Sequence, residues 1–388
     1  MDFHDRPRLP RGFRCAARHC GIKSQGLDLS LFASDVPAAA AALFTRNHFP
    51  GAPVVVGRER IRGGRLQAVI ANSRISNVAT GQQGIEDART MALLAARDLG
   101  IAEELVLMSS TGVIGERLPM EKLERGIMGL AGELDTDPWP AARGIMTTDT
   151  EPKVLSLDVG GGTLTAVGKG AGMIAPNMAT MLVFLFTDLE LPANALRRAL
   201  RSASLDSFEC LSIDSDTSTS DTVAILANGH AGAVEDERFA SALEVACLRM
   251  AEWVARDGEG ATKLIRVRVE GAHDDGDGRR VARAVVDSPL VKTMVFGGDP
   301  NVGRILMAIG KCVECRIDPG RVEARLQGVT VVERGERAVF DPARVRHLLD
   351  QDTVEIDVFL GLGDGRGLGI GCDLTEGYIQ ENAAYSSS

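Results

Sequence analysis

The chain has 388 residues, a length that favours two lobes over a single domain. Its net charge of −10 argues against nucleic acid or an anionic membrane surface as its main partner. The N-terminus leads into no apolar segment of a signal peptide, and no run approaches the roughly 20 apolar residues of a membrane span.

The first third of the chain alternates strand and helix patterns. We expect a strand beginning near Phe13 and further strands at Leu66–Asn72 and Leu105–Met108. Between the last two, Thr80–Gly84 opens a helix with a regular apolar face. The turn Ser109–Gly115 follows a strand, and backbone N–H groups there could form an oxyanion hole. Such turns are also common without any catalytic role.

The most informative stretch is Lys169–Leu182, where two glycines and a proline lead to Thr180 and the apolar run Met181–Phe186. That run is short enough for a buried strand, although periodicity does not exclude a helix. A threonine hydroxyl needs an adjacent base, and cleavage just before it would supply its own α-amine. With an unperturbed pKa of about 7.7–8.0, that amine accepts a proton near neutral pH. The alternative is a glycine-rich loop with an incidental threonine.

The second half continues the mixed pattern. Apolar periodicity predicts helices at residues 195–203, 236–256 and 342–349. Alternation predicts strands at Ile265–Val269 and Val354–Leu360. The run Gly361–Gly369 satisfies no dinucleotide-binding pattern, so we interpret it as a hairpin connection. The acidic, hydroxyl-rich run Asp214–Val223 could bind a metal, but turn and cap hydrogen bonding is the preferred interpretation.

The cysteines suggest a reducing compartment rather than a disulfide framework. There are seven, an odd number, and they are thinly spread, so we expect a cytoplasmic protein. Cys312 and Cys315 form a CxxC, but no second CxxC or histidine pair accompanies them at zinc spacing. Core packing or chance is the preferred interpretation of this pair.

Several motifs resemble those of the ornithine acetyltransferase (glutamate N-acetyltransferase) family. Lys169–Leu182 is similar to its self-cleavage segment, which ends in Met-Ala-Thr-Met-Leu. Further similar segments are Leu43–Asn47, Ser109–Met120, Ile145–Thr150 and Asn382–Ser388. The resemblance extends from about residue 11 to Ser388. It implies self-cleavage between Ala179 and Thr180, after which Thr180 carries an acetyl group between two amines.

The resemblance also implies a role for each residue of the site. Thr180 is the nucleophile, while Thr111 and Gly112 donate hydrogen bonds to the oxyanion. The implied substrate-binding residues are Thr147, Lys169, Thr180, Glu259, Asn382 and Ser387. Lys169 contacts a substrate carboxylate and Glu259 a substrate amine. No metal or other cofactor is implied, and acetyl-CoA enters only as a possible substrate.

The implied fold is α/β, with mixed sheets layered with helices, an N-terminal-nucleophile-like arrangement and a smaller C-terminal α/β lobe. Cleavage gives an alpha chain, residues 1–179, and a beta chain, residues 180–388. We expect structural lobes at roughly residues 11–285 and 286–388. The implied assembly is a heterotetramer of two alpha and two beta chains, acting on small amino-acid substrates.

The implied reaction moves acetyl from N2-acetylornithine to glutamate through an acetyl-threonine in arginine biosynthesis. Some segments depart from the family pattern: Asn72–Asn77, Val302 in place of tryptophan, and Ser220 in place of asparagine. A side branch of the family with another N-acyl donor or acceptor is therefore an alternative. Three other classes stay open: an N-terminal-nucleophile amidohydrolase or aminopeptidase, a redox or metal protein built on Cys312 and Cys315, and a non-catalytic ligand-binding protein.

Overall fold

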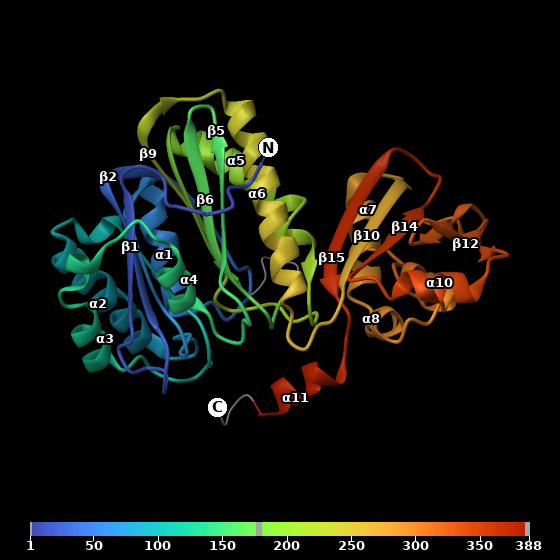
Figure 1. The fold of residues 1–388 in the computed structure, drawn as a ribbon, viewed down its shortest axis with the longest axis horizontal. Coiled ribbons are helices and arrows are strands. Elements are labelled where there is room, and N and C mark those ends of the chain that lie inside the picture. Colours follow the sequence, from blue (N-terminus) through green and yellow to red (C-terminus); the bar gives the residue numbers. More distant parts are fainter. Residues whose placement is uncertain (1, 176–180, 385–388) are drawn as a thin grey trace. The chain divides into compact units, whose positions relative to one another are not determined.

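The computed structural model describes residues 2–175 and 181–384. The chain divides into two compact units. Unit 1 comprises residues 1–170, 177–205 and 217–250, and unit 2 comprises residues 171–176, 206–216 and 251–388. Both contain a mixed sheet with helices, which confirms the expected fold class (Figure 1). Within the described ranges, every helix is too short or too polar to cross a membrane.

Unit 1 is built on an eight-stranded sheet of described residues, in the order β4-β3-β2-β9-β7-β6-β5, with β1 paired to β2. The centre of this sheet is a parallel pair, β7 and β9, flanked by antiparallel neighbours β6 and β2. The strands are β1 (Phe13–Arg18), β2 (Leu29–Phe44), β3 (Arg65–Asn72), β4 (Val106–Ser110), β5 (Lys153–Val159), β6 (Gly162–Lys169), β7 (Leu182–Glu190) and β9 (Thr222–Ala233).

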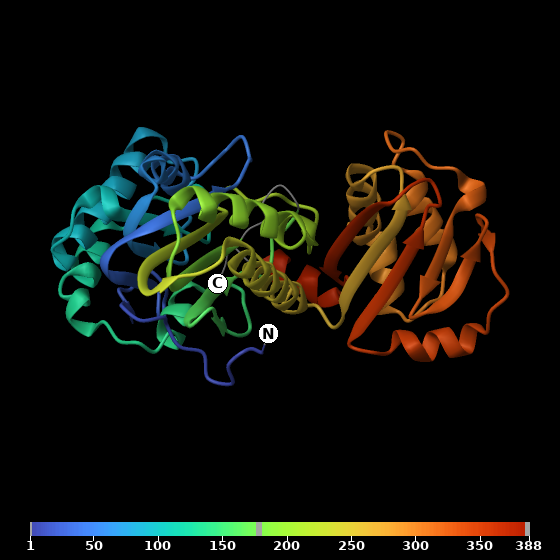
Figure 2. The same cartoon turned by 90° about the horizontal axis from the view of Figure 1, so that it is seen from above.

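The two faces of this sheet belong to different apolar cores because side chains alternate along each strand. On β2, Leu29 and Leu31 pack in a core that includes the apolar face of α2. Phe32 points the other way, and its ring centroid lies 5.1 Å from that of Phe186 on β7. The teal helices α2 and α3 lie together in Figures 1 and 2. The helices of unit 1 are α1 (Ala52–Arg60), α2 (Gly81–Leu99), α3 (Met120–Ile127), α4 (Trp139–Ile145), α5 (Ala193–Leu205) and the first part of α6 (Asp236–Arg256).

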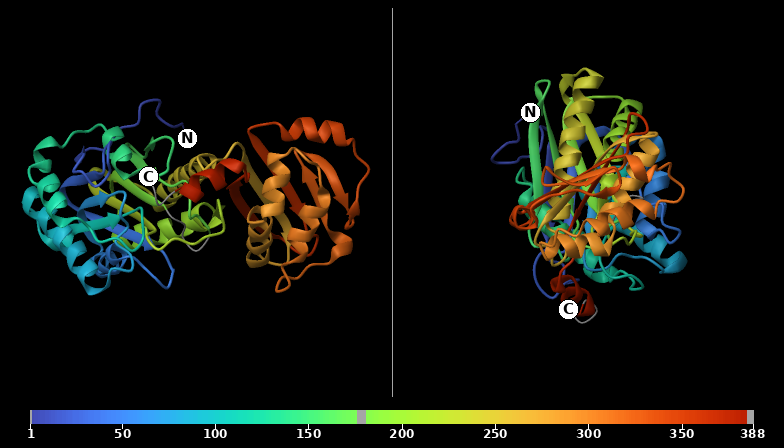
Figure 3. Two further views of the ribbon diagram at one scale, coloured as in Figure 1. Left: turned by 90° about the horizontal axis from the view of Figure 1, so that it is seen from below. Right: turned by 90° about the vertical axis from the view of Figure 1, so that its right-hand side faces the viewer.

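Unit 2 has a seven-stranded sheet of described residues, ordered β13-β12-β11-β14-β10-β15-β8. Its core lies where inward-facing Val267 and Val269 of β10 meet Val281 and Val285 of α7. Helix α7 packs against β10 and β15, and α8 and α9 pack against α7 in the gold to red part of the chain in Figure 3. The strands are β8 (Leu211–Ser212), β10 (Leu264–Ala272), β11 (Glu323–Leu326), β12 (Val329–Glu333), β13 (Glu336–Arg337), β14 (Thr353–Phe359) and β15 (Gly365–Cys372), and the helices are α7 (Asp275–Val286), α8 (Pro289–Phe296), α9 (Val302–Gly310), α10 (Pro342–Leu349) and α11 (Glu376–Ala384).

The hairpin interpretation of Gly361–Gly369 is wrong. Gly365–Cys372 is strand β15, and β10 lies between β14 and β15. The glycines of β15 serve close packing against α7: a Cβ on Gly367 would lie 2.1 Å from the carbonyl carbon of Gly278, and one on Gly369 would lie 2.8 Å from the oxygen of Ala282. The alternate glycines thus let a helix approach the strand backbone.

The division into units also differs from the lobe boundary expected near residue 285. Strand β10 pairs with β14 in parallel and with β15 in antiparallel orientation. It therefore belongs with the residues that follow position 286. Cys312 lies in the core of unit 2 and Cys315 packs against it, as the preferred interpretation of that pair predicts. In the run Asp214–Val223, Asp214 accepts hydrogen bonds from the backbone N–H groups of Met173 and Ile174.

Candidate active site

The segment that should carry the nucleophile leaves the sheet of unit 1 at the end of β6 and returns at the start of β7. Lys169 and Leu182 are register partners in the antiparallel β6–β7 pair, so the chain between them begins and ends at the same end of these two strands. Ala179 and Thr180 lie outside the described residues, and Met181 is the first described residue after them. The chain therefore leaves β6 and enters β7 at the same place in the sheet.

Lys169 is the centre of a buried polar cluster at that end of the strands. Only 2% of the residue is exposed. Its Nζ donates to Oγ1 of Thr147 at 2.8 Å and to Oγ1 of Thr111 at 3.3 Å. Lys169 thus contacts both threonines, and all three residues, which are far apart in sequence, were predicted for the site. Of the neighbouring pair Thr147 and Thr148, Thr147 is the one whose hydroxyl contacts this lysine.

The carboxylate of Asp149 holds the residues of the cluster together. Its Oδ1 accepts hydrogen bonds from Nζ of Lys153 at 2.9 Å and from the N–H of Gly170 at 2.6 Å. Its Oδ2 accepts from the N–H of Thr147 at 3.0 Å and lies 3.9 Å from Nζ of Lys169. Burial acts to raise the pKa of Asp149, but Lys169 and Lys153 outweigh it and hold the pKa at about 2. The carboxylate is therefore charged throughout the neutral range.

The turn after β4 supplies donors of two different kinds. The N–H of Thr111 is engaged because it donates to the backbone oxygen of Asn72 at 3.1 Å. Thr111 can therefore reach a substrate oxygen only through its hydroxyl. Since that hydroxyl oxygen accepts a hydrogen bond from Lys169, its own hydrogen is directed to another acceptor.

Gly112 is a position that requires glycine. Its φ is +125°, in a region that residues with a side chain rarely adopt. A Cβ there would lie 2.2 Å from the carbonyl carbon and oxygen of Arg74. The loop containing Arg74 is itself strained, since Arg74, Asn77 and Ala79 all have positive φ values. The close approach of two loops brings the backbone of Gly112 next to that of Arg74.

A second polar cluster lies within unit 2, after the end of α6. The N–H of Glu259 donates to the oxygen of Ala171 at 2.8 Å, and the residue is 8% exposed. Nδ2 of Asn382, on α11, donates to Oε2 of Glu259 at 2.8 Å. A Cβ on Gly172 would lie 2.4 Å from the Glu259 carboxyl group, so glycine is needed there as well.

The predicted residues therefore fall into two described groups. Unit 1 brings together Thr111, Thr147 and Lys169, with Gly112 beside Thr111. Unit 2 brings together Glu259 and Asn382. Ser387, like Ala179 and Thr180, lies outside the described residues.

Sequence reasoning missed Asp149 and Lys153. Asp149 lies inside the segment Ile145–Thr150, which we singled out for its threonines. An acid within a predicted binding segment was the available signal. The register of β5 and β6, in which Lys153 is paired with Gly168, brings the second lysine to the same end of the strands as Lys169.

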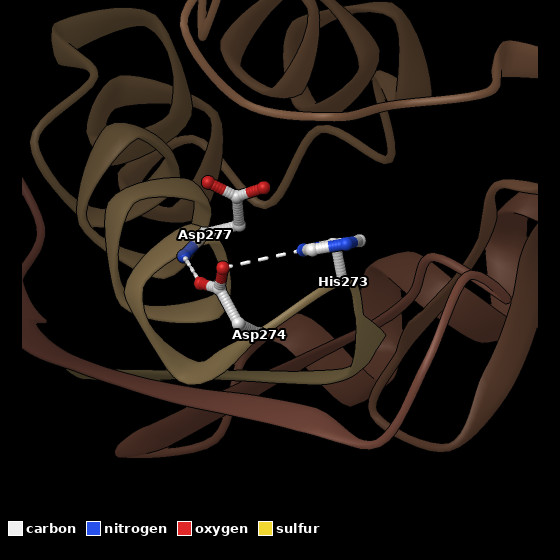
Figure 4. Close-up of side chains that lie close together, drawn as sticks. All are labelled: His273, Asp274 and Asp277. Carbon is white, nitrogen blue, oxygen red and sulfur yellow. Dashed lines mark hydrogen bonds and ion pairs between the residues drawn. The ribbon is translucent and has the colours of Figure 1, made fainter.

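Other features of the described residues fit substrate chemistry less well. A pocket of about 840 Å³ is lined by the N-terminal segment Arg8–Arg14 and the β5–β6 turn, at the opposite end of the sheet from Lys169. In unit 2, His273, Asp274 and Asp277 lie close enough together to hold a metal ion (Figure 4).

The three side chains of Figure 4 already have partners that oppose a cation. Asp274 is the N-cap of α7 and accepts from the N–H of Asp277 at 2.9 Å. Asp277 pairs with the guanidinium of Arg280 at 2.9 Å and accepts from the N–H of Arg316 at 3.0 Å. The guanidinium of Arg316 contacts Nε2 of His273. This arrangement is the hydrogen bonding of a helix start, and the guanidinium groups of Arg280 and Arg316 supply its positive charge.

Hydroxyl and backbone N–H donors held in fixed positions beside a buried cation are groups that can stabilise the oxyanion of an acyl-transfer reaction. Comparison with known proteins agrees with this class. The model of the ArgJ family matches residues 14–387. The arginine biosynthesis bifunctional protein ArgJ 2 of Nostoc sp. is 45% identical over 97% of this chain and 98% of its own length.

Two further relatives extend this result. The glutamate N-acetyltransferase Oat2 of Streptomyces clavuligerus is 44% identical over 98% of this chain and 99% of its own length. The crystal structure of the ArgJ protein from Bacillus halodurans is 37% identical, with a TM-score of 0.50, and covers 52% of this chain and 98% of that one. The chain belongs to the ArgJ family, and the resemblance seen in its motifs is confirmed. It is an acyltransferase.

Proposed function

We propose that the chain cleaves itself between Ala179 and Thr180 and then transfers acetyl from N2-acetylornithine to glutamate through an acetyl ester of Thr180. The observation that carries this proposal is the contact of Lys169 with both Thr111 and Thr147 where β6 ends. Lys169 and Leu182 are register partners, and Leu182 follows Thr180 by two residues in sequence. The cluster thus lies where the chain carrying Thr180 rejoins the sheet.

In the first half-reaction, Lys169 and the Thr147 hydroxyl bind the carboxylate of the donor. The hydroxyl of Thr111 and the N–H of Gly112 donate to the oxygen of its acetyl group. Oγ of Thr180 attacks the acetyl carbon and passes its proton to the α-amine of the same residue. The C–N bond of the donor then breaks, the departing nitrogen takes the proton, and ornithine leaves.

In the second half-reaction, the amine of glutamate attacks the acetyl ester of Thr180. The Thr180 oxygen leaves, and the proton lost by the attacking nitrogen returns to it. Glu259 and Asn382 are proposed to contact the amine-bearing part of the substrate, and Ser387 to complete this contact. The two half-reactions share one acyl-enzyme, so the kinetics should be ping-pong.

Two observations support cleavage near the middle of the chain. The sequence that leads to Ala179 contains Gly170, Gly172 and Pro176, which are residue types typical of turns. The solved chain from Bacillus halodurans aligns over 98% of its own length yet covers 52% of this one. This proportion is close to the share that residues 180–388 contribute.

The finer properties follow from family membership as expectations. We propose a heterotetramer of two alpha and two beta chains, location in the cytoplasm, and a reaction that needs no metal or other cofactor. Acetyl-CoA is proposed as a second donor to glutamate. Native mass measurement would test the assembly, and transfer after dialysis against a chelator would test metal independence.

The central test is intact-mass analysis followed by transfer assays. The purified protein should contain two chains, residues 1–179 and 180–388, and the second should begin Thr-Met-Leu. Thr180→Ala should remain a single chain. N2-acetylornithine alone should add one acetyl mass to the 180–388 chain, and glutamate should remove it.

The outcomes of this test separate the alternatives. An active, uncut wild-type enzyme would disprove cleavage. Release of free acetate at the same rate with and without glutamate would indicate a hydrolase. Acylation by another N-acyl amino acid, but not by N2-acetylornithine, would move the chain to a side branch of the family while leaving the mechanism in place.

A further inference from the structure

Lys23 is a half-buried lysine that the proposed mechanism leaves unused, although it contacts the segment that carries Thr147. It lies in the loop between β1 and β2. Its Nζ donates to the backbone oxygen of Met146 at 2.8 Å and to that of Leu27 at 2.9 Å. Because Met146 directly precedes Thr147, this side chain links the loop between β1 and β2 to the candidate site.

The loop that carries Lys23 is held in place by a completely buried acid. The carboxylate of Asp28 accepts hydrogen bonds from three backbone N–H groups of this loop, those of Cys20 at 2.6 Å, Ile22 at 2.7 Å and Lys23 at 3.0 Å. Backbone N–H groups that converge on an anion form a stable arrangement. The side chain of Lys23 therefore extends from a backbone that is fixed at its own N–H.

The contact with Met146 is one of two that hold a single peptide group. The oxygen of the Met146–Thr147 peptide accepts from Lys23, and the N–H of the same peptide donates to Oδ2 of Asp149 at 3.0 Å. A peptide group is planar, so holding both of its polar atoms fixes the Cα of Thr147 and limits the directions that its side chain can take. This peptide lies between α4 and β5, where side chains do what a sheet ladder does elsewhere.

The direction of the Thr147 side chain decides what its hydroxyl can bind. Its Oγ1 accepts a hydrogen bond from Nζ of Lys169 at 2.8 Å, and the residue is half-buried. A hydroxyl has one hydrogen to donate, and a hydrogen bond weakens steeply as its angle departs from linearity. A carboxylate bound by Lys169 can therefore also accept from Thr147 only while that side chain keeps its direction.

The contacts of Lys23 do not depend on its charge. Burial is the largest effect and lowers the pKa of Lys23 below its ordinary value. Asp28 and Asp149 act against this shift, and the charge of Lys169 adds to it. The ammonium has three N–H groups and the neutral amine has two, so either form can donate to both of the carbonyl oxygens that Lys23 contacts.

We propose that Lys23 is a positioning residue, which holds the peptide before Thr147 and so directs the Thr147 hydroxyl toward the carboxylate of the donor. The inference rests on the proposed function, in which Thr147 and Lys169 bind that carboxylate. The carboxylate is remote from the reacting carbonyl, so this contact is equally strong before and during the reaction. Lys23 should therefore affect the half-saturating concentration of the donor and not the limiting rate.

The first test uses Lys23→Met, which keeps an unbranched side chain but has no N–H groups. The rate at which N2-acetylornithine acetylates the 180–388 chain is measured by mass over a range of donor concentrations. The half-saturating concentration should rise about 10-fold, because a hydrogen bond to a charged group is weakened. The limiting rate should change less than about 2-fold. A limiting rate that falls as much as the donor affinity would overturn the proposal.

The second test combines Lys23→Met with Thr147→Val. The valine removes the hydroxyl that Lys23 is proposed to direct, so Thr147→Val alone should raise the half-saturating concentration of the donor. Adding Lys23→Met to Thr147→Val should then cause no further increase, because both changes remove the same contact. If the two effects multiply in the double variant, Lys23 acts elsewhere and the proposal is wrong.

Lys122→Met is the matched control. Nζ of Lys122 also donates to a backbone oxygen of the loop between β1 and β2, that of Gly21 at 2.5 Å, but this peptide is not the one before Thr147. Its loss should leave the half-saturating concentration unchanged. An unaltered value in Lys23→Met would refute the inference, as would a Lys23→Met chain that stays uncut or fails to fold, which would assign the lysine to folding. A wild-type chain that N2-acetylornithine does not acetylate would instead refute the proposed function.

Discussion

Replacing Asp149 by asparagine should be one of the most damaging single changes in unit 1. The carboxylate is the shared counter-charge of two buried ammonium groups: the side chain of Lys153 is 0% exposed and that of Lys169 is 3% exposed. Asparagine has nearly the same size but no charge, so both buried lysines would lose their counter-charge. Removing one partner of a buried ion pair typically costs about 3–5 kcal/mol, and we expect a loss of that size in the stability of unit 1.

The pKa of Asp149 predicts a related effect of acid. The folded pKa is held at about 2, below the ordinary value of 3.8, so the stabilisation is present above pH 3.8 and is lost as the pH falls toward 2. The shift corresponds to about 2 kcal/mol. This value is smaller than the cost of the substitution because it compares charged with protonated carboxyl rather than removing the acid altogether. In Asp149→Asn this part of the acid dependence should disappear.

The assay is urea unfolding followed by tryptophan fluorescence in a Trp253→Phe background. The chain has two tryptophans, so this background leaves Trp139, at the start of α4, as the reporter of unit 1. Asp158→Asn is the matched control, because it removes an acid from the same strand region whose side chain is 72% exposed and pairs with His4. The control should change stability by no more than about 1 kcal/mol.

A double variant tests the assigned cause. Adding Lys153→Met to Asp149→Asn removes one stranded charge, so the pair should be more stable than Asp149→Asn alone. A loss below about 1 kcal/mol in Asp149→Asn, or no recovery in the double variant, would refute the argument that stranded lysines cause the effect.

Three further predictions concern the turn after β4 and the thiols. Thr111→Val should still be cut but lose about 10²- to 10³-fold in acetylation rate, measured by mass after donor addition, because the proposed oxyanion donor is lost. Thr111→Ser should recover most of that rate. Gly112→Ala should abolish transfer, since its Cβ meets the Arg74 carbonyl, whereas Gly115→Ala, at a positive φ but with open space, should retain most activity in the same assay. Burial raises the pKa of both Cys15 and Cys210 to about 12, so iodoacetamide at about pH 8 should leave them unlabelled in the native protein and label all seven cysteines after denaturation, as read by peptide mass.

Local pattern was sufficient for many elements of the fold. The helices at residues 236–256 and 342–349 were predicted with the bounds that the structure has, because their apolar periodicity and end signals lie within the segment itself. The strand in the glycine-rich segment after β14 was not predicted. Its glycines are required by close packing against α7, a helix that lies far earlier in the chain. No local signal specifies that the neighbour of a strand will be a helix backbone in close contact.

The candidate site divides in the same way. Motif resemblance pointed to Thr111, Thr147 and Lys169, and the structure brings these three into contact. It gave no indication that the Thr111 N–H is occupied by Asn72, which follows from the parallel pairing of β3 with β4. It also passed over Asp149, because an acid in a polar segment is usually exposed and only the folded structure shows that this one is buried.

The order of strands in unit 1 has a consequence for the life of the cut enzyme. Strands β7 and β9, which follow Thr180, lie between β2 and β6, which precede it. A chain cut before Thr180 therefore shares one sheet between its two pieces, and native refolding requires them to meet. In the uncut chain, the peptide bond before Thr180 keeps the two pieces at a high effective concentration. Recovery of the cut enzyme from urea should therefore depend on protein concentration, whereas recovery of uncut Thr180→Ala should not. The cut enzyme would then persist because it unfolds slowly, rather than because it refolds readily.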